Sequence, residues 1–139
     1  MTAREVAKAL GRTVTAPTES SAAATDQLAG RSGCAWSSRD ESAAVLVELV
    51  RTKDVARSVR RTGFSAAARF QAAVTDNPTA ESIDSLGDRA LFAVGASQLW
   101  LLVDDDLVIF EVAVTPTSGA RDVALHLAAT AESRLQRAD

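Results

Sequence analysis

Apolar residues recur at helical spacing at the start of the chain. Thr2 and Glu5 have the separation of a capping box, in which the side chain of each residue accepts a hydrogen bond from the backbone N–H of the other. Gly11 follows the last apolar residue and is placed to end the helix, because glycine readily adopts the left-handed conformation found there. The pattern predicts a helix over residues 2–10.

Two later segments also carry helical periodicity. Between Lys53 and Asn77 the apolar positions lie three to five residues apart, with an interruption expected near Gly63. Asn77 should end this region because Pro78 follows it, and the residue before a proline is pushed away from helical angles. Residues 120–137 predict a closing amphipathic helix.

The first strand-like patterns lie in the N-terminal half. Residues 34–36 form a short apolar run, and residues 43–50 alternate with many β-branched side chains. Residues 39–41 are polar and fit a hairpin turn between them. By contrast, residues 12–33 show little periodicity, which predicts a long flexible surface connection with one weak strand near Val14.

Three closely spaced strands are predicted in the C-terminal half. A turn over residues 83–89 leads into strands at 90–94, 98–103 and 107–114. The connections are short enough for tight hairpins, so the strands should form an antiparallel meander. The order of elements is then helix, strands, helix, three strands, helix. This order predicts a single α+β domain over residues 1–139, with helices mainly on one face of an antiparallel sheet.

Composition agrees with one globular domain. The chain has 139 residues, of which 47% are hydrophobic and 24% charged. Its net charge of -3 argues against nucleic-acid binding, which needs a concentrated excess of Lys and Arg. There is no apolar run of about 18 residues, so we expect no transmembrane segment. Residues 1–5 lack the basic and apolar stretches of a signal peptide, so we expect a cytoplasmic chain or a mature form.

Residues with catalytic or metal-binding chemistry are sparse. His126 is the single histidine and Cys34 the single cysteine, and neither lies in a catalytic or metal-ligand motif. Residues 104–106 are three aspartates whose adjacency suits a hairpin turn better than a calcium loop. We therefore expect no catalytic residue, no metal and no cofactor. The arginines at 57, 60, 61 and 69 fit a solvated helix face, with an anion site as the alternative.

The aromatic residues offer a possible apolar pocket between sheet and helices. As core residues they would pack against one another, and as pocket residues they would line a ligand site. The candidates for ligand binding are Trp36, Phe70, Phe92, Trp100, Phe110 and His126, with Phe64 as a further aromatic. A second open question is oligomeric state, because apolar residues on both faces of the meander require cover on both faces. A homodimer would supply it if the helices cover one face.

Several short patterns occur in the order found in a known family. They are the opening stretch over residues 2–11, Cys34-Ala35-Trp36, Leu86-Gly87-Asp88-Arg89-Ala90, the paired strands over residues 99–114, and the closing stretch over residues 124–135. In these the chain resembles small actinobacterial secreted proteins and lipoproteins of unknown function. The excess of Arg over Lys, 13 to 2, is also typical of GC-rich genomes such as those of actinobacteria.

This resemblance implies an α+β domain with a layout similar to PsbP-like folds. It implies a non-enzymatic binding or interaction module of the cell envelope, whose partner is an unknown protein or a small apolar ligand. The alternative is a small-molecule-binding protein, or a cyclase- or isomerase-like enzyme, with an apolar pocket between sheet and helices. A location in the envelope is expected for a mature form, and a cytoplasmic one if Met1 is the native start.

Overall fold

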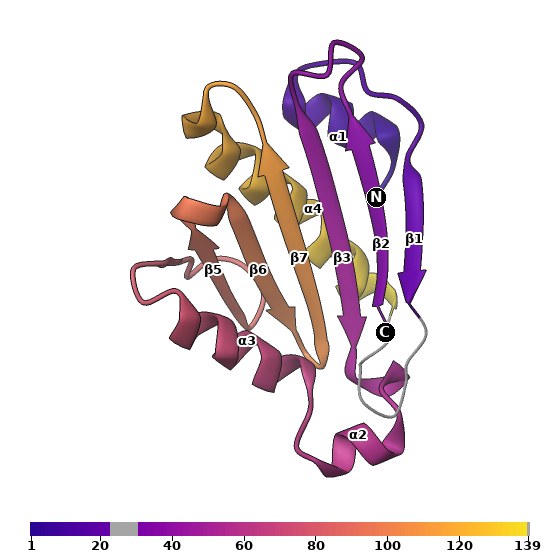
Figure 1. Cartoon of the computed structure of the whole chain (residues 1–139), viewed down its shortest axis with the longest axis vertical. Coiled ribbons are helices and arrows are strands. Elements are labelled where there is room, and N and C mark those ends of the chain that lie inside the picture. The colour runs from indigo at the N-terminus through magenta and orange to yellow at the C-terminus, as the bar shows by residue number, and fades with distance from the viewer. Residues whose placement is uncertain (23–30, 139) are drawn as a thin grey trace.

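The computed structural model describes residues 1–22 and 31–138, which build helices around one antiparallel sheet (Figure 1). The helices are α1 (Ala3–Leu10), α2 (Arg57–Arg61), α3 (Ala66–Asp76) and α4 (Ala120–Ala138). The strands are β1 (Thr18–Ala22), β2 (Arg31–Ser37), β3 (Ala44–Arg51), β4 (Glu81–Ser82), β5 (Arg89–Ala93), β6 (Gln98–Val103) and β7 (Asp106–Ala113). Short 3₁₀ turns precede α2 and α4 and connect β5 to β6.

The sheet has seven strands in the order β1-β2-β3-β7-β6-β5-β4, and every neighbouring pair is antiparallel. The predicted α+β class is therefore confirmed. So is the meander, because β5, β6 and β7 are consecutive in the chain and adjacent in the sheet. The last strand, β7, also pairs with β3, which joins the N-terminal hairpins to the meander.

The first helix begins and ends where the sequence predicts. Glu5 N–H donates to Thr2 Oγ1 at 3.3 Å, and Thr2 N–H donates to Glu5 Oε2 at 2.7 Å, which completes the capping box. Gly11 ends the helix with φ 66°, a value that costs glycine little. The long helical region is interrupted as expected, because α2 ends at Arg61 and Ser65 caps a new helix.

The prediction that residues 12–33 form one long connection is wrong for part of that range. Thr18–Ala22 is a strand that pairs with Ala35–Arg31 of β2, and β2 itself begins at Arg31. Near Val14 the expected weak strand is a single bridge to Ser38. Edge strand β1 has few apolar side chains, so its sequence lacks the alternation that reveals a half-buried strand. The expectation for residues 23–30 lies outside the described residues.

Helices cover both faces of the sheet. Figure 1 shows α4 crossing behind β7 and β3, and α1 and α4 bury one face while α3 packs on the other. The core on the α4 face includes Val6, Val45, Leu99, Leu101, Val108, Phe110, Val112, Ala124, Leu127 and Ala128. The core on the α3 face includes Val50, Phe70, Ala73, Leu91, Leu102, Leu107 and Ile109. The two sets alternate along each strand, as side chains in β-structure must.

This arrangement removes the premise of the meander-mediated homodimer. Leu99, Leu101, Val108 and Phe110 are covered by the helices of their own chain, and the alternate positions of the meander are covered by α3. A second chain is not needed to bury either set, so a homodimer stays a prediction without that argument. Among the described helices, none is long and apolar enough to cross a membrane.

Candidate functional site

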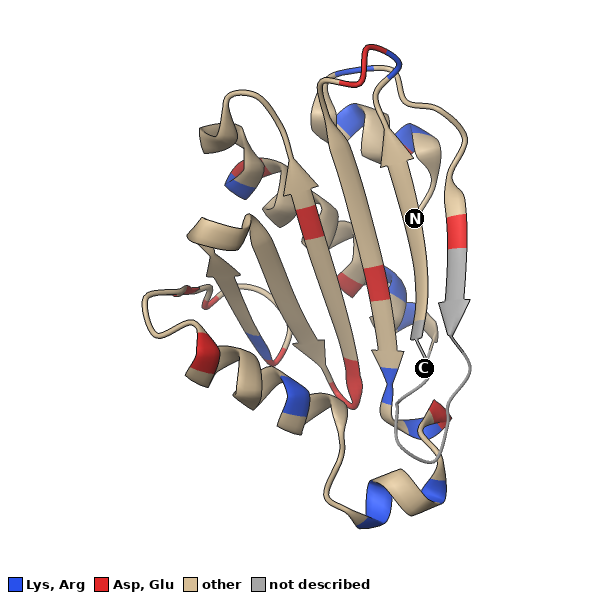
Figure 2. Ribbon diagram, in the orientation of Figure 1, with Lys and Arg blue, Asp and Glu red and all other residues tan. Residues whose placement is uncertain are grey.

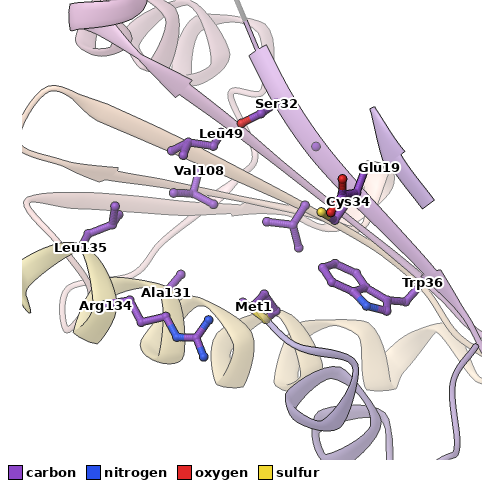
Figure 3. A pocket seen from close by; sticks show the side chains of 12 residues that line it. Met1, Glu19, Ser32, Cys34, Trp36, Leu49, Val108, Ala131, Arg134 and Leu135 are labelled. Carbon is purple, nitrogen blue, oxygen red and sulfur yellow. The ribbon is translucent and has the colours of Figure 1, made fainter. Parts of the chain in front are cut away.

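The candidate site is a cavity of about 650 Å³ on the α4 face of the sheet. It opens between the C-terminal half of α4 and strands β1, β2, β3 and β7 (Figure 3). The residues lining it are Met1, Glu19, Ser32, Gly33, Cys34, Trp36, Val47, Leu49, Val108, Ala131, Arg134 and Leu135. Most of these side chains are apolar, so the cavity is suited to an apolar occupant.

Strand register explains why these side chains meet. Cys34 lies opposite Val47 in the β2–β3 pair, and Leu49 lies opposite Val108 in the β3–β7 pair. All four therefore point to the face that α4 covers, because residues directly opposite in antiparallel strands share a face.

Small side chains leave the space open. Cys34 and Ala131 line the cavity from the sheet and from α4, where larger side chains would reduce its volume. Further toward its N-terminus, α4 packs directly on the sheet through Ala124, Leu127 and Ala128, which are fully buried. The cavity thus begins where the helix passes from the meander toward β2 and β3.

Trp36 forms one wall of the cavity and is only 2% exposed. Figure 3 shows its ring extending into the space between the sheet and the helices, with the nitrogen on the edge nearer the helices. That indole nitrogen has no hydrogen-bond partner among the described residues. A buried donor without a partner is unfavourable, so the indole contributes apolar ring surface to the wall together with one N–H that is not satisfied.

The charged side chains of the lining lie at its exposed margin. Glu19 on β1 and Arg134 on α4 are both exposed, and so is Ser32. Arg134 Nη2 donates to Glu5 Oε1 at 2.5 Å, which links α4 to α1 beside the cavity. Partial burial raises the pKa of Glu5, but hydrogen bonds from Thr2 and the charge of Arg134 outweigh it, so the pKa lies below its usual value.

Cys34 is the one thiol of the chain and lies half-buried in the cavity wall. Figure 3 places its sulfur beside the Glu19 side chain. His126, by contrast, is exposed on α4 and lies outside the lining. Within residues 1–22 and 31–138, no group of three or more His, Cys, Asp or Glu side chains could hold a metal ion.

Of the aromatic candidates from the sequence, Trp36 lines this cavity and the others lie elsewhere. Phe92 and Phe110 are buried in the core beneath α4. On the opposite face, Phe70 is buried under α3 and Trp100 packs beside it. Cations lie over these two rings, with Arg89 Cζ 4.8 Å from the Phe70 centroid and Arg69 Cζ 6.0 Å from that of Trp100. Phe64 also packs on that face.

Sequence reasoning missed most of the aliphatic lining and both charged groups at its margin. Val47 and Leu49 carried a signal in the alternation of residues 43–50, although nothing in that pattern separates a cavity wall from a packed core. Glu19 fell within a segment interpreted as a connection, and Arg134 falls within the predicted closing helix, whose periodicity carries no signal for a site.

Figure 2 shows basic residues on α2 and acidic residues at the turn between β6 and β7. None of the residues of these charge clusters lines the cavity. Asp104 adopts φ 51° in the β6–β7 turn, and its N–H donates to Asp88 Oδ2 at 2.6 Å. Asp106 Oδ2 lies 3.3 Å from Arg51 Nε. The arginines at 57, 60 and 61 are exposed on the short helix α2. The aspartates therefore lie in a hairpin turn, and the arginines of α2 lie on a solvated helix, as the sequence indicated.

Comparison with known proteins gives no relative: no family model matches the chain, and no significant match occurs among curated proteins or solved structures. The resemblance to small actinobacterial secreted proteins and lipoproteins stays a prediction.

Proposed function

We propose that this chain is a non-enzymatic binding module that takes a small, mainly apolar ligand in the cavity beneath α4. The observation that carries the proposal is the cavity itself, with its aliphatic and indole walls and its charged margin. Its volume of about 650 Å³ falls in the range of about 300–1,000 Å³ typical of small-molecule sites. Removing an apolar molecule from water into such walls supplies the driving force.

Binding is favoured over catalysis by the choice of ionisable groups. Acid–base catalysis needs a proton-transferring group within hydrogen-bond reach of the substrate, and histidine is the most common such group. The cavity holds Glu19, Cys34 and Arg134, and Arg134 is already paired with Glu5. The single histidine, His126, lies outside it. A cyclase- or isomerase-like activity is the alternative, and turnover that depends on Cys34 would favour that alternative.

A cell-envelope location and an actinobacterial origin belong to the same proposal. They rest on the resemblance of the opening stretch, Cys34-Ala35-Trp36 and the later motifs, and on the excess of Arg over Lys. If the partner is a protein instead of a small molecule, an apolar side chain of that protein would occupy the same cavity. Fractionation of the native host, followed by detection of the chain in envelope and cytoplasmic fractions, tests the location.

The cavity is tested with the uncharged fluorescent dye N-phenylnaphthylamine, whose emission rises in apolar surroundings. We expect saturable binding, which Ala131→Phe weakens by about tenfold or more because the new ring occupies part of the cavity. Ala129→Phe is the matched control, since Ala129 is exposed on the same helix and does not line the cavity. Unfolding curves confirm that both variants fold. Equal binding by the two variants, or no saturable binding at all, rejects the proposal.

A further inference from the structure

We infer that the ligand is a single-chain amphiphile whose tail fills the cavity and whose head carries both a positive and a negative charge. This inference deepens the proposed function and rests on it. It follows from how charge is distributed around the opening. The inner walls consist of apolar side chains, whereas the charged side chains of the lining, Glu19 and Arg134, are both exposed at the margin.

An apolar interior with a polar margin orients an amphiphile. Trp36 and Val108 are buried, and Val47, Leu49 and Leu135 are partly buried around the space. A charged group placed among them would lose its hydration without gaining a partner, which is strongly unfavourable. The head of an amphiphile must therefore stay at the opening, where Glu19, Ser32 and Arg134 lie.

The two charges at the opening come from opposite sides of the cavity. Glu19 belongs to β1 on the sheet side, and Arg134 belongs to α4 on the helix side (Figure 3). A head of one sign can pair with only one of these two side chains. A head with separated charges of both signs can place its cation near Glu19 and its anion near Arg134.

Both side chains retain capacity for a ligand. Glu19 has no ion pair with any described residue, so its carboxylate is available to a cation. Arg134 uses Nη2 to bind Glu5 Oε1, and its planar guanidinium carries further N–H donors. The other Glu5 oxygen accepts from Thr2 N and Thr2 Oγ1, which satisfies that carboxylate. An anionic oxygen can thus bind Arg134 without displacing Glu5.

Three probes with the same tail test the head group: decylphosphocholine, decyltrimethylammonium and decyl sulfate, all below their critical micelle concentrations. Displacement of N-phenylnaphthylamine gives the three affinities. We expect the zwitterion to bind about threefold more tightly than either singly charged probe, the size typical of exposed charge pairs. High salt should shrink that advantage, because screening weakens exposed pairs.

Substitutions at the opening assign the preference to its two charges. Glu19→Gln should abolish the advantage of the zwitterion over decyl sulfate, and Arg134→Gln should abolish its advantage over decyltrimethylammonium. Arg134→Lys keeps the charge and should restore the preference. The matched controls are Glu111→Gln, on the opposite face of the sheet, and Arg137→Gln, exposed on α4 outside the lining. Both should leave the order of affinities unchanged.

The outcomes separate this inference from the proposed function. If the dye binds and all three probes displace it equally, the head-group inference is overturned while the cavity remains an apolar site. The same holds if the dye binds and no probe displaces it, or if the preference survives Glu19→Gln together with Arg134→Gln. If the dye itself does not bind, the proposed function fails and the inference fails with it.

Discussion

Arg134 Nη2 lies 2.5 Å from Glu5 Oε1, although the two residues are 129 positions apart in the sequence. The pair joins the N-terminal helix α1 to the C-terminal helix α4 beside the opening of the cavity. Their side chains are 46% and 30% exposed, so water screens the attraction. The contact therefore adds little to the stability of the fold.

A double-mutant cycle measures this pair. With Glu5→Gln, Arg134→Gln and the double variant, we expect a coupling free energy of about 0.5 kcal/mol in urea unfolding. The coupling should fall in high salt, since the pair is exposed. The coupling should also be lost in acid. The pKa of Glu5 is lowered in the folded state, so the charged carboxylate stabilises the fold above the usual glutamate pKa, and protonation removes that contribution. A coupling of zero at low salt would contradict the prediction.

Asp40 should make stability depend on pH. Its Oδ1 accepts from Ser38 Oγ and Ser42 Oγ at 2.6 Å and from Ser42 N at 3.1 Å, which holds the pKa of this carboxyl well below its usual 3.8. The charged form is therefore favoured by folding. Its contribution is present above pH 3.8 and is lost as pH falls further toward the lowered pKa.

Comparison with Asp40→Asn isolates that contribution from other carboxylates. The wild type should be the more stable protein near neutral pH, and the difference in urea midpoint should narrow as pH falls below 3.8. Asp84→Asn is the control, since Asp84 is exposed and has no side-chain hydrogen bond or ion pair with the described residues. A difference between wild type and Asp40→Asn that stays constant with pH would show that the charge of Asp40 is not responsible.

Gly87 occupies a position that no larger residue fits. Its φ is +54°, and an added Cβ would lie 2.5 Å from the Leu102 carbonyl oxygen and 2.7 Å from Leu101 Cδ1. We expect Gly87→Ala to destabilise the fold by about 2–4 kcal/mol in urea unfolding, from backbone strain and steric overlap together. Gly95→Ala is the control, because Gly95 has open space and no positive φ. A loss below about 1 kcal/mol for Gly87→Ala would show that the turn can move.

Substitution by alanine should affect stability very differently at two adjacent residues of α4. Leu127 is fully buried, so Leu127→Ala should cost about 2–5 kcal/mol of unfolding free energy. His126 is exposed beside it, so His126→Ala should change stability by less than about 0.5 kcal/mol. The same variant should bind N-phenylnaphthylamine as the wild type does, because His126 lies outside the cavity. Loss of dye binding in a folded His126→Ala protein would show that His126 takes part in ligand binding.

Much of the fold could be predicted because its signals are local. The Thr2 and Glu5 capping box, the break before α3 and the short connections of the meander are each determined by a few consecutive residues. Strand β1 escaped prediction because it is an edge strand with few apolar side chains, and its hydrogen bonds depend on β2. Its pairing is tertiary information that the local pattern of residues 18–22 does not contain.

The candidate site depended on tertiary structure far more than the fold did. Aromatic residues were reasonable pocket candidates, yet most of them fill the two cores, and Trp36 shares the cavity with aliphatic residues from β3, β7 and α4. A cavity forms where small residues from distant segments face one another. That condition cannot be recognised until Cys34 of β2 and Ala131 of α4 are known to line the same cavity.

The sequence by itself determined the α+β fold class, the approximate ends of most helices and strands, and the absence of obvious catalytic motifs. Periodicity and capping act over a few residues, so they can be interpreted without knowing the fold. Only the tertiary structure decided that α3 covers one face and α4 the other, that α4 leaves a cavity over β2 and β3, and that Glu19 and Arg134 stand at its opening. The physical reason is that packing and charge pairing depend on distance in space, which separation along the chain does not specify.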